Sequence, residues 1–177
     1  MHQLLLLRHA KSSWEDPELA DHARPLSRRG ERAAAAISRA MSELGLAPEL
    51  ILVSPARRTM QTLAALAPYP KGTRIETPKH LYLADAGGLL AVLTAVPEAT
   101  RSVLVLGHNP GLHELALLLT ARPRKGADSA DAHRLAQSFP TAALAEFAVS
   151  CRWSELGAGA GRLIRFVVPR DLPEMAA

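Results

Sequence analysis

The chain has 177 residues, of which 48% are hydrophobic and 4% aromatic, and its formal net charge is +4. This length allows one domain with a substantial core, and no run of about twenty apolar residues could cross a bilayer. One cysteine excludes an internal disulfide framework, and basic runs interleaved with aromatic residues, typical of nucleic-acid binding, are missing. The first residues do not resemble a secretory signal. We therefore expect a cytoplasmic protein that binds neither nucleic acid nor membrane.

Short apolar runs alternate with helical patterns along the chain. In chain order we predict a strand at 3–7, a helix at 30–44, a strand at 50–53, helices at 56–66 and 87–96, a strand at 103–106, a helix at 111–120, and strands at 142–149 and 163–168. This alternation predicts an α/β fold, a three-layer sandwich with a mostly parallel, mixed sheet flanked by helices. Only a glycine-rich stretch separates the last two strands, so we expect them to form an antiparallel hairpin.

We expect residues 1–177 to form a single domain. The stretch 122–137 is polar and charged, and we predict it to be the most mobile segment. The tail over 170–177 is predicted to be frayed.

Two histidines follow buried strands. Arg8-His9 ends the first strand, and Gly107-His108-Asn109-Pro110 follows the strand at 103–106. Ligands of open α/β sheets bind beyond the carboxyl ends of strands, so neighbouring parallel strands would point both histidines into one crevice. Arginine suits phosphate oxygens and histidine can act as a nucleophile, which indicates phosphoryl transfer. In the alternative interpretation Arg8-His9 turns to solvent, Asn109 caps a helix and Pro110 begins it.

A third strand end carries an arginine motif, Ser54-Pro55-Ala56-Arg57-Arg58. Ser54 is a candidate N-cap and Pro55 suits the first helical position, so a helix would begin here and favour an anion at its N-terminus. The alternative is a capped amphipathic helix with two solvated arginines. Lys11 and Ser12, directly after the first histidine, would offer further donors to a bound phosphate.

These motifs resemble those of the histidine phosphatase superfamily, whose fold is phosphoglycerate-mutase-like. The matching stretches are Leu7-Arg8-His9-Ala10-Lys11-Ser12, Ser54-Pro55-x-x-Arg58-x-x-Gln61-Thr62 and Gly107-His108-Asn109-Pro110. The stretches 24–30, 81–82 and 139–143 are similar to the short branch typified by the phosphohistidine phosphatase SixA. The resemblance covers residues 3–168.

The resemblance implies that His9 is the nucleophile that becomes phosphorylated, and that Arg8, Arg58 and His108 complete the phosphate pocket. It also makes Ser12, Asn109, Lys11 and Arg24 candidates for substrate binding, although Lys11 and Arg24 could equally be solvated. A neighbouring arginine disfavours the imidazolium form, so the pKa of His9 should be lowered and its ring neutral near pH 7.

The general acid is where this chain departs from the family. Many relatives place a glutamate after the third strand, but residues 80–88 contain none. Asp85 is the only nearby carboxylate, and it could instead cap the following helix. A site short of a strong acid handles good leaving groups best, and the imidazole of phosphohistidine is one. Two guanidiniums would neutralise the phosphoryl group without a metal, so we expect neither a metal nor another cofactor.

The sequence therefore predicts a metal-independent phosphatase with a covalent phosphohistidine intermediate. Its partner would be a phosphorylated substrate, either a protein phosphohistidine or a small phosphorylated compound. The alternatives are a sugar- or nucleotide-phosphate monoesterase, and a non-catalytic module that binds phosphate or a phosphoprotein. The sequence does not determine the oligomeric state.

Overall fold

A mixed β-sheet forms the centre of the fold. In the computed structural model, which describes residues 1–121 and 129–175, six strands lie in the order β3-β2-β4-β1-β5-β6. The strands are β1 (His2–Arg8), β2 (Leu50–Val53), β3 (Arg74–Glu76), β4 (Ser102–Gly107), β5 (Leu144–Val149) and β6 (Gly161–Val167). Strands β3, β2, β4 and β1 are parallel, whereas β5 runs antiparallel to both β1 and β6. The predicted mixed sheet and its final antiparallel hairpin are confirmed.

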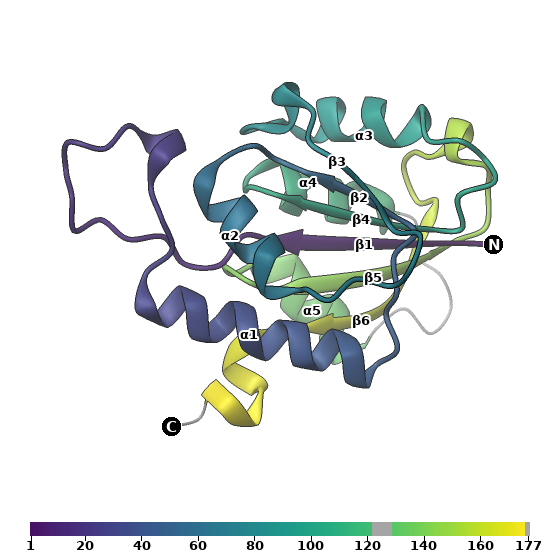
Figure 1. Cartoon of the computed structure of the whole chain (residues 1–177). Helices are drawn as coiled ribbons and strands as arrows, with labels where there is room; N and C mark the ends of the chain where they lie inside the picture. The colour runs from purple at the N-terminus through teal and green to yellow at the C-terminus, as the bar shows by residue number, and fades with distance from the viewer. Residues whose placement is uncertain (122–128, 176–177) are drawn as a thin grey trace.

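Helices cover both faces of the sheet. They are α1 (Arg28–Glu43), α2 (Arg57–Ala65), α3 (Ala86–Thr94), α4 (Gly111–Leu119) and α5 (Ala130–Gln137). Figure 1 shows α1 and α2 in front of the sheet, with α4 and α5 behind it. Side chains alternate between the faces of a strand, so Leu5 and Leu7 pack with α1 and α2 while Leu4 and Leu6 pack with α3, α4 and α5. The leucine run of β1 is therefore a central strand buried on both sides, and the three-layer fold is confirmed.

The sheet brings the first two histidine motifs together. Strands β1 and β4 are parallel neighbours, and their register pairs Arg8 with Gly107 at the carboxyl end. In Figure 1 these ends lie on the left, where the segment between β1 and α1 projects from the body. The residues that follow the two strands, His9 and His108, therefore start from adjacent backbone positions.

Three local predictions differ from the structure. Strand β3 was not predicted, because its three residues are exposed and show no apolar pattern. Helix α5 occupies part of the stretch predicted to be most mobile, where Ser129 caps it and Leu135 is buried; residues 122–128 lie outside the described part. The predicted frayed tail is wrong up to Met175, because 3-10 turns at Pro169–Asp171 and Pro173–Met175 pack near α1, and Glu174 pairs with Arg39 at 2.9 Å.

Within the described residues, none of the helices combines the length and the apolar character that crossing a bilayer requires.

Candidate active site

Two buried imidazoles face each other at the carboxyl edge of the sheet. The ring centroids of His9 and His108 are 5.1 Å apart, and only 7% and 3% of these residues are exposed. The His9 amide donates to the Gly107 carbonyl at 3.1 Å, which continues the β1–β4 ladder by one residue. The structure thus brings together the two histidines that the sequence predicted to share a crevice.

Arg58 joins the two imidazoles. Its Nε donates to His9 Nε2 at 3.3 Å, and its Nη2 lies 3.3 Å from His108 Nδ1. Arg58 is in the first turn of α2 and is 4% exposed, whereas the neighbouring Arg57 points to solvent. Of the two arginines in the motif, Arg58 is therefore the one that belongs to the histidine pair.

The hydrogen bonds assign a proton to each ring. His9 Nδ1 lies 2.7 Å from the Ala10 carbonyl, which can only accept, so Nδ1 carries the proton and Nε2 keeps its lone pair. His108 Nδ1 accepts from Arg58, so its proton is on Nε2, which donates to Ser54 Oγ at 2.7 Å. Both lone pairs therefore point at the guanidinium of Arg58, and His9 Nε2 is the nitrogen free to attack an electrophile.

Burial and positive neighbours keep both rings neutral. The pKa of His9 falls to about 4, first because burial disfavours the charged form and then because Arg58, Arg8 and Arg24 repel it. The pKa of His108 falls to about 3, again mainly through burial and then through His9 and Arg58. The predicted lowering of the His9 pKa is confirmed, and burial contributes more to it than the arginines do.

Arg8 and Asn109 donate hydrogen bonds to the same backbone carbonyl. Arg8 Nη1 and Asn109 Nδ2 each donate to the Phe139 carbonyl at 2.9 Å. Among the described residues, Arg8 Nε and Asn109 Oδ1 are buried without a hydrogen-bond partner. The alternative interpretation, in which Asn109 caps α4, is wrong, because Pro110 is the N-cap residue and the amide of Asn109 is turned toward Phe139. Each histidine thus has a sequence neighbour with a buried polar atom that makes no hydrogen bond within the described residues.

The turn after Phe139 shapes the backbone at the first histidine. Ala142 adopts a left-handed conformation with a φ of 58°, and its amide lies 3.1 Å from the carbonyl oxygens of both Arg8 and His9. This explains why the stretch 139–143, far along the chain, belongs to the same local structure as the Arg8-His9 motif.

The start of α2 differs from its prediction. The helix begins at Arg57 with Ala56 as the N-cap residue, so Ser54 does not cap it and Pro55 precedes it. The Ser54 hydroxyl holds His108 instead. Further along α2, Thr62 Oγ1 accepts a hydrogen bond from the Ala10 amide at 3.0 Å, which connects α2 to the loop after His9.

The candidate binding residues Ser12 and Arg24 bind each other. Arg24 Nη2 donates to Ser12 Oγ at 2.5 Å, and Arg24 Nε donates to the Ser13 carbonyl at 3.1 Å. Arg24 is buried, and its hydrogen bonds hold the segment 12–27 together. Its guanidinium is stacked on the exposed ring of Trp14. Lys11 is exposed and makes no ion pair within the described residues. Substrate contacts for these residues remain predictions.

Asp85 caps α3, as the alternative interpretation predicted. Its Oδ1 accepts from the Gly88 amide at 2.7 Å, and the residue is exposed. The structure does not bring this carboxylate into contact with His9, Arg58 or His108, and its role as a general acid stays a prediction.

Sequence reasoning missed Asp21 and assigned no role to Tyr82. Asp21 Oδ2 accepts from Arg58 Nη2 at 2.9 Å and from the Tyr82 hydroxyl at 2.6 Å. The Tyr82 ring lies edge-on to His108, with centroids 5.6 Å apart. These hydrogen bonds, first that from Tyr82 and then that from Arg58, hold the pKa of Asp21 at about 2, so the carboxylate is ionised. The only signal in the sequence close to Asp21 was the stretch 24–30, which is similar to the short branch of the family.

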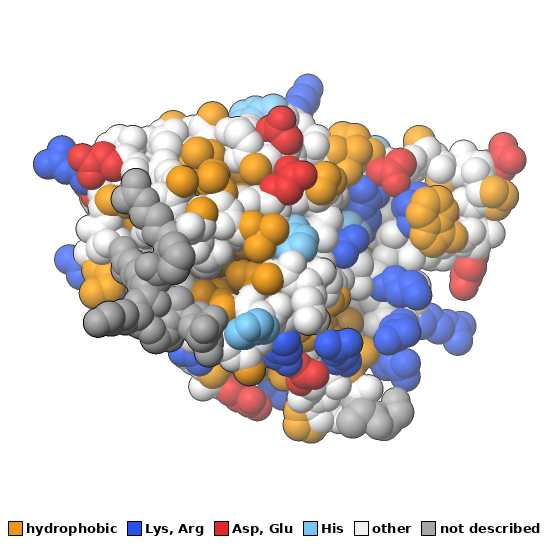
Figure 2. All heavy atoms as spheres, turned by 180° about the vertical axis from the view of Figure 1, so that it is seen from behind, with side chains coloured by type: hydrophobic (Ala, Val, Ile, Leu, Met, Phe, Trp, Pro, Cys, Tyr) orange, Lys and Arg blue, Asp and Glu red, His pale blue; other side chains and the backbone are white. Residues whose placement is uncertain are grey.

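Basic side chains surround this edge of the molecule. Arg28, Arg29 and Arg57 are exposed at the starts of α1 and α2, and Figure 2 shows Lys and Arg side chains gathered on the side where the segment 12–27 projects. Such a rim attracts anions. Within the described residues, no group of three or more His, Cys, Asp or Glu side chains could hold a metal ion.

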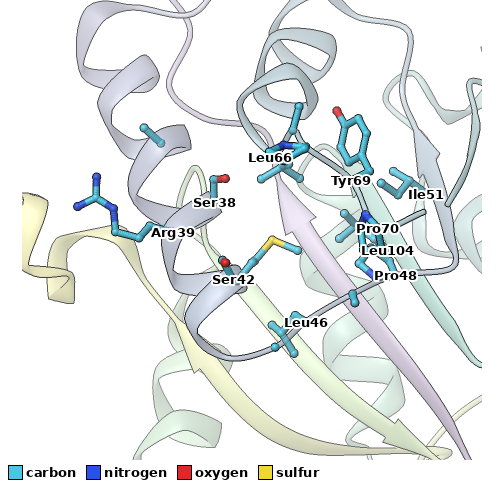
Figure 3. Close-up of a pocket in the computed structure, with 16 residues that line it drawn as sticks. Ser38, Arg39, Ser42, Leu46, Pro48, Ile51, Leu66, Tyr69, Pro70 and Leu104 are labelled. Carbon is cyan, nitrogen blue, oxygen red and sulfur yellow. The ribbon is translucent and has the colours of Figure 1, made fainter. Parts of the chain in front are cut away.

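A separate cavity of about 650 Å³ lies between α1 and the segment that follows α2. Figure 3 shows its lining, which includes Ser42, Leu46 and Tyr69. None of the histidines or arginines of the site lines it, so it is distinct from the histidine pair.

This sheet and this pair of strand-end histidines bridged by an arginine define a class of protein. The family model of the histidine phosphatase superfamily (branch 1) matches residues 4–88, a range that includes Arg8, His9 and Arg58. The chain belongs to this superfamily, as the sequence motifs predicted.

Individual relatives extend the match over nearly the whole chain. An uncharacterized protein of Mycobacterium tuberculosis, Rv1276c, is 34% identical over 168 residues, covering 93% of this chain and 100% of the relative. The structure of a proposed phosphohistidine phosphatase SixA of Nakamurella multipartitia aligns with a TM-score of 0.83 at 27% identity, covering 95% of this chain and 96% of the other. That of Agrobacterium tumefaciens aligns with a TM-score of 0.75 at 28% identity, covering 95% and 98%. The predicted short, SixA-like branch is confirmed.

Proposed function

We propose that the protein is a metal-independent phosphatase that works through a phosphohistidine at His9. One observation carries the proposal: the lone pairs of two neutral, buried imidazoles converge on one edge of the Arg58 guanidinium. A phosphoryl group bound there would meet a ready nucleophile and a planar pair of N–H donors. Arg8, with its buried unpartnered Nε, supplies a second cation beside it.

The reaction has two steps. His9 Nε2 forms a bond to phosphorus while the bond to the leaving group breaks, and the leaving group departs with the electron pair. Water then attacks phosphorus, the P–N bond breaks, its electron pair returns to His9, and inorganic phosphate is released. The guanidiniums of Arg8 and Arg58 offset the charge that spreads over the phosphoryl oxygens. A bound anion also favours protonation of His108, which can then donate to it.

The leaving group that the site suits best is an imidazole. Asp85 is used as a helix cap, and Asp21 is ionised at any pH above about 2, so neither is a ready proton donor at pH 7. An alkoxide leaving group needs such a donor, whereas the imidazole of a phosphohistidine leaves as a neutral ring once its other nitrogen has taken a proton from water. The likeness to proteins described as phosphohistidine phosphatases, at 27% and 28% identity, supports the same substrate class.

Turnover of para-nitrophenyl phosphate in the presence of EDTA tests the phosphatase. His9→Ala should reduce the rate to background, and wild-type enzyme quenched during turnover should carry an acid-labile phosphate on His9. His80→Ala, at an exposed histidine outside the site, is the matched control and should keep full activity. Undiminished hydrolysis by His9→Ala would refute the assignment.

The substrate class is tested with a panel at equal concentrations. We expect a phosphohistidine-carrying protein to be hydrolysed with a higher kcat/KM than sugar phosphates and nucleoside monophosphates. A reversed order would favour the monoesterase. Binding of phosphate without turnover of any substrate would favour a phosphate-binding module.

A further inference from the structure

The Arg58 guanidinium is held at two edges by different partners. Its Nε and Nη2 face the lone pairs of His9 and His108, each at 3.3 Å. At its other edge, Nη1 donates to the Asp21 carbonyl at 2.6 Å and Nη2 donates to Asp21 Oδ2 at 2.9 Å. These contacts to Asp21 are shorter, and one of them is charge-assisted, so they are the stronger pair.

Asp21 is itself fixed by two other side chains. Tyr82, from the segment before α3, donates to Oδ2 at 2.6 Å, and Arg24 Nη1 donates to Oδ1 at 3.0 Å from within the same segment as Asp21. The side chain of Asp21 is 47% exposed, although both arginines that it binds are buried. It therefore contributes little to the core, and its side-chain contacts are with the two guanidiniums and the Tyr82 hydroxyl.

We propose that Asp21 is a positioning residue for phosphoryl binding. By holding the Nη1/Nη2 edge of Arg58, it presents the Nε/Nη2 edge to the space between the histidines, where phosphoryl oxygens would replace the weak contacts to the rings. Asp21 acts only through Arg58. This inference rests on the proposed function for its kinetic consequences, while its effect on anion binding can be measured without turnover.

Four variants test the proposal. Asp21→Ala should lower kcat/KM for para-nitrophenyl phosphate by about tenfold or more and weaken the binding of inorganic phosphate similarly, because Arg58 loses its orientation. Asp21→Asn keeps an oxygen that can accept from Arg58 and should lose less. Tyr82→Phe removes a hydrogen bond that fixes the Asp21 carboxylate and should also lower the activity. Glu18→Ala removes an exposed carboxylate from the same segment and should stay within about twofold of wild type.

A double-mutant cycle with Arg58→Lys separates positioning from a loss of loop structure. Lysine has no second edge to hold, so in this background Asp21→Ala should change the phosphate affinity, measured by calorimetry, by less than about twofold. If Asp21→Ala lowered the phosphate affinity as much in the Arg58→Lys background as in the wild-type protein, Asp21 would not act through Arg58, and the proposal would be overturned. An Asp21→Ala protein with wild-type phosphate affinity would also overturn it.

The remaining outcomes are also decisive. If Asp21→Ala fails to fold, the phosphate affinities of Asp21→Asn and Tyr82→Phe decide the question in the same way. If the wild-type protein binds phosphate but hydrolyses nothing, the proposed function fails, and the phosphate cycle still confirms or rejects the role of Asp21.

Discussion

Arg58 is the residue on which the site depends most. It is buried between two imidazoles that both stay neutral, and its charge is one reason why they do. A nucleophilic histidine needs an unprotonated nitrogen, and the bond from His9 Nδ1 to the Ala10 carbonyl leaves that nitrogen on the Arg58 side. In the proposed mechanism, the guanidinium would hold the phosphoryl group and keep the nucleophilic nitrogen of His9 unprotonated.

The pKa of His9 measures this coupling directly. In phosphate-free buffer, NMR titration of the imidazole nitrogens should show His9 titrating at about 4 in the wild-type protein. Arg58→Gln removes a positive neighbour and should raise that pKa by at least about 0.5 unit, while burial keeps it below 6.5. Arg57→Gln, at the exposed neighbouring arginine, should leave it unchanged. A wild-type His9 that titrates near 6.5 would contradict the neutral pair.

The sequence was informative wherever a site residue follows a strand. Arg8, His9 and His108 stand directly at strand ends, and Arg58 lies in the first turn of the helix after another strand, so their convergence could be predicted from topology. Asp21 could not be predicted in the same way. It lies in a segment with several acidic residues, and only the folded loop shows which of them reaches Arg58, 37 residues further on.

At the scale of elements, two helices approach neighbouring backbone so closely that only glycine fits. A Cβ on Gly30 of α1 would lie 2.0 Å from the Lys11 carbonyl oxygen, and one on Gly111 of α4 would lie 2.0 Å from the Ala84 carbonyl oxygen. The first contact seats α1 against the loop after His9, and the second seats the start of α4 against the turn before α3. The helices therefore position both histidine loops through backbone packing.

Replacing Gly111 with alanine tests this packing. The new methyl group would force the start of α4 away from Ala84, which should destabilise the protein by about 1–3 kcal/mol and displace His108, three residues earlier. We expect a loss of kcat/KM together with a lower midpoint in urea denaturation. Gly87→Ala is the control, because a Cβ there would meet only the Asp85 carboxylate at 3.6 Å. Wild-type activity in Gly111→Ala would show that α4 does not fix His108.

Element ends were harder to predict than element existence. Ser54 and Asn109 both have the chemistry of a helix cap, but in the structure Ser54 is hydrogen-bonded to His108 and Asn109 donates to the Phe139 carbonyl. Local sequence could not distinguish these uses, because the competing partners come from distant parts of the chain. The same holds for α5: its polar composition predicts mobility, but the structure buries Leu135.

At the scale of the molecule, the site is built at a cost to stability. The sheet buries apolar side chains on both faces, and at its carboxyl edge this core extends to two imidazoles that burial keeps from being protonated. An unfolded chain has no such restriction, and its histidines titrate near 6.5. The folded and unfolded states therefore bind different numbers of protons in mildly acidic solution.

This difference predicts how stability depends on pH. As the pH falls below about 6.5, the unfolded chain gains protons at His9 and His108 that the folded state cannot accept until about pH 4 and 3, so the free energy of unfolding must fall. Each such proton contributes a slope of about 1.4 kcal/mol per pH unit. Urea denaturation at pH 7, 6, 5 and 4.5 should show the decline, and His9→Gln should make it shallower, whereas His80→Gln should not. A wild-type stability that stays constant from pH 6.5 to 5 would mean that the pair accepts protons in the folded protein, and the neutral nucleophile would be lost with it.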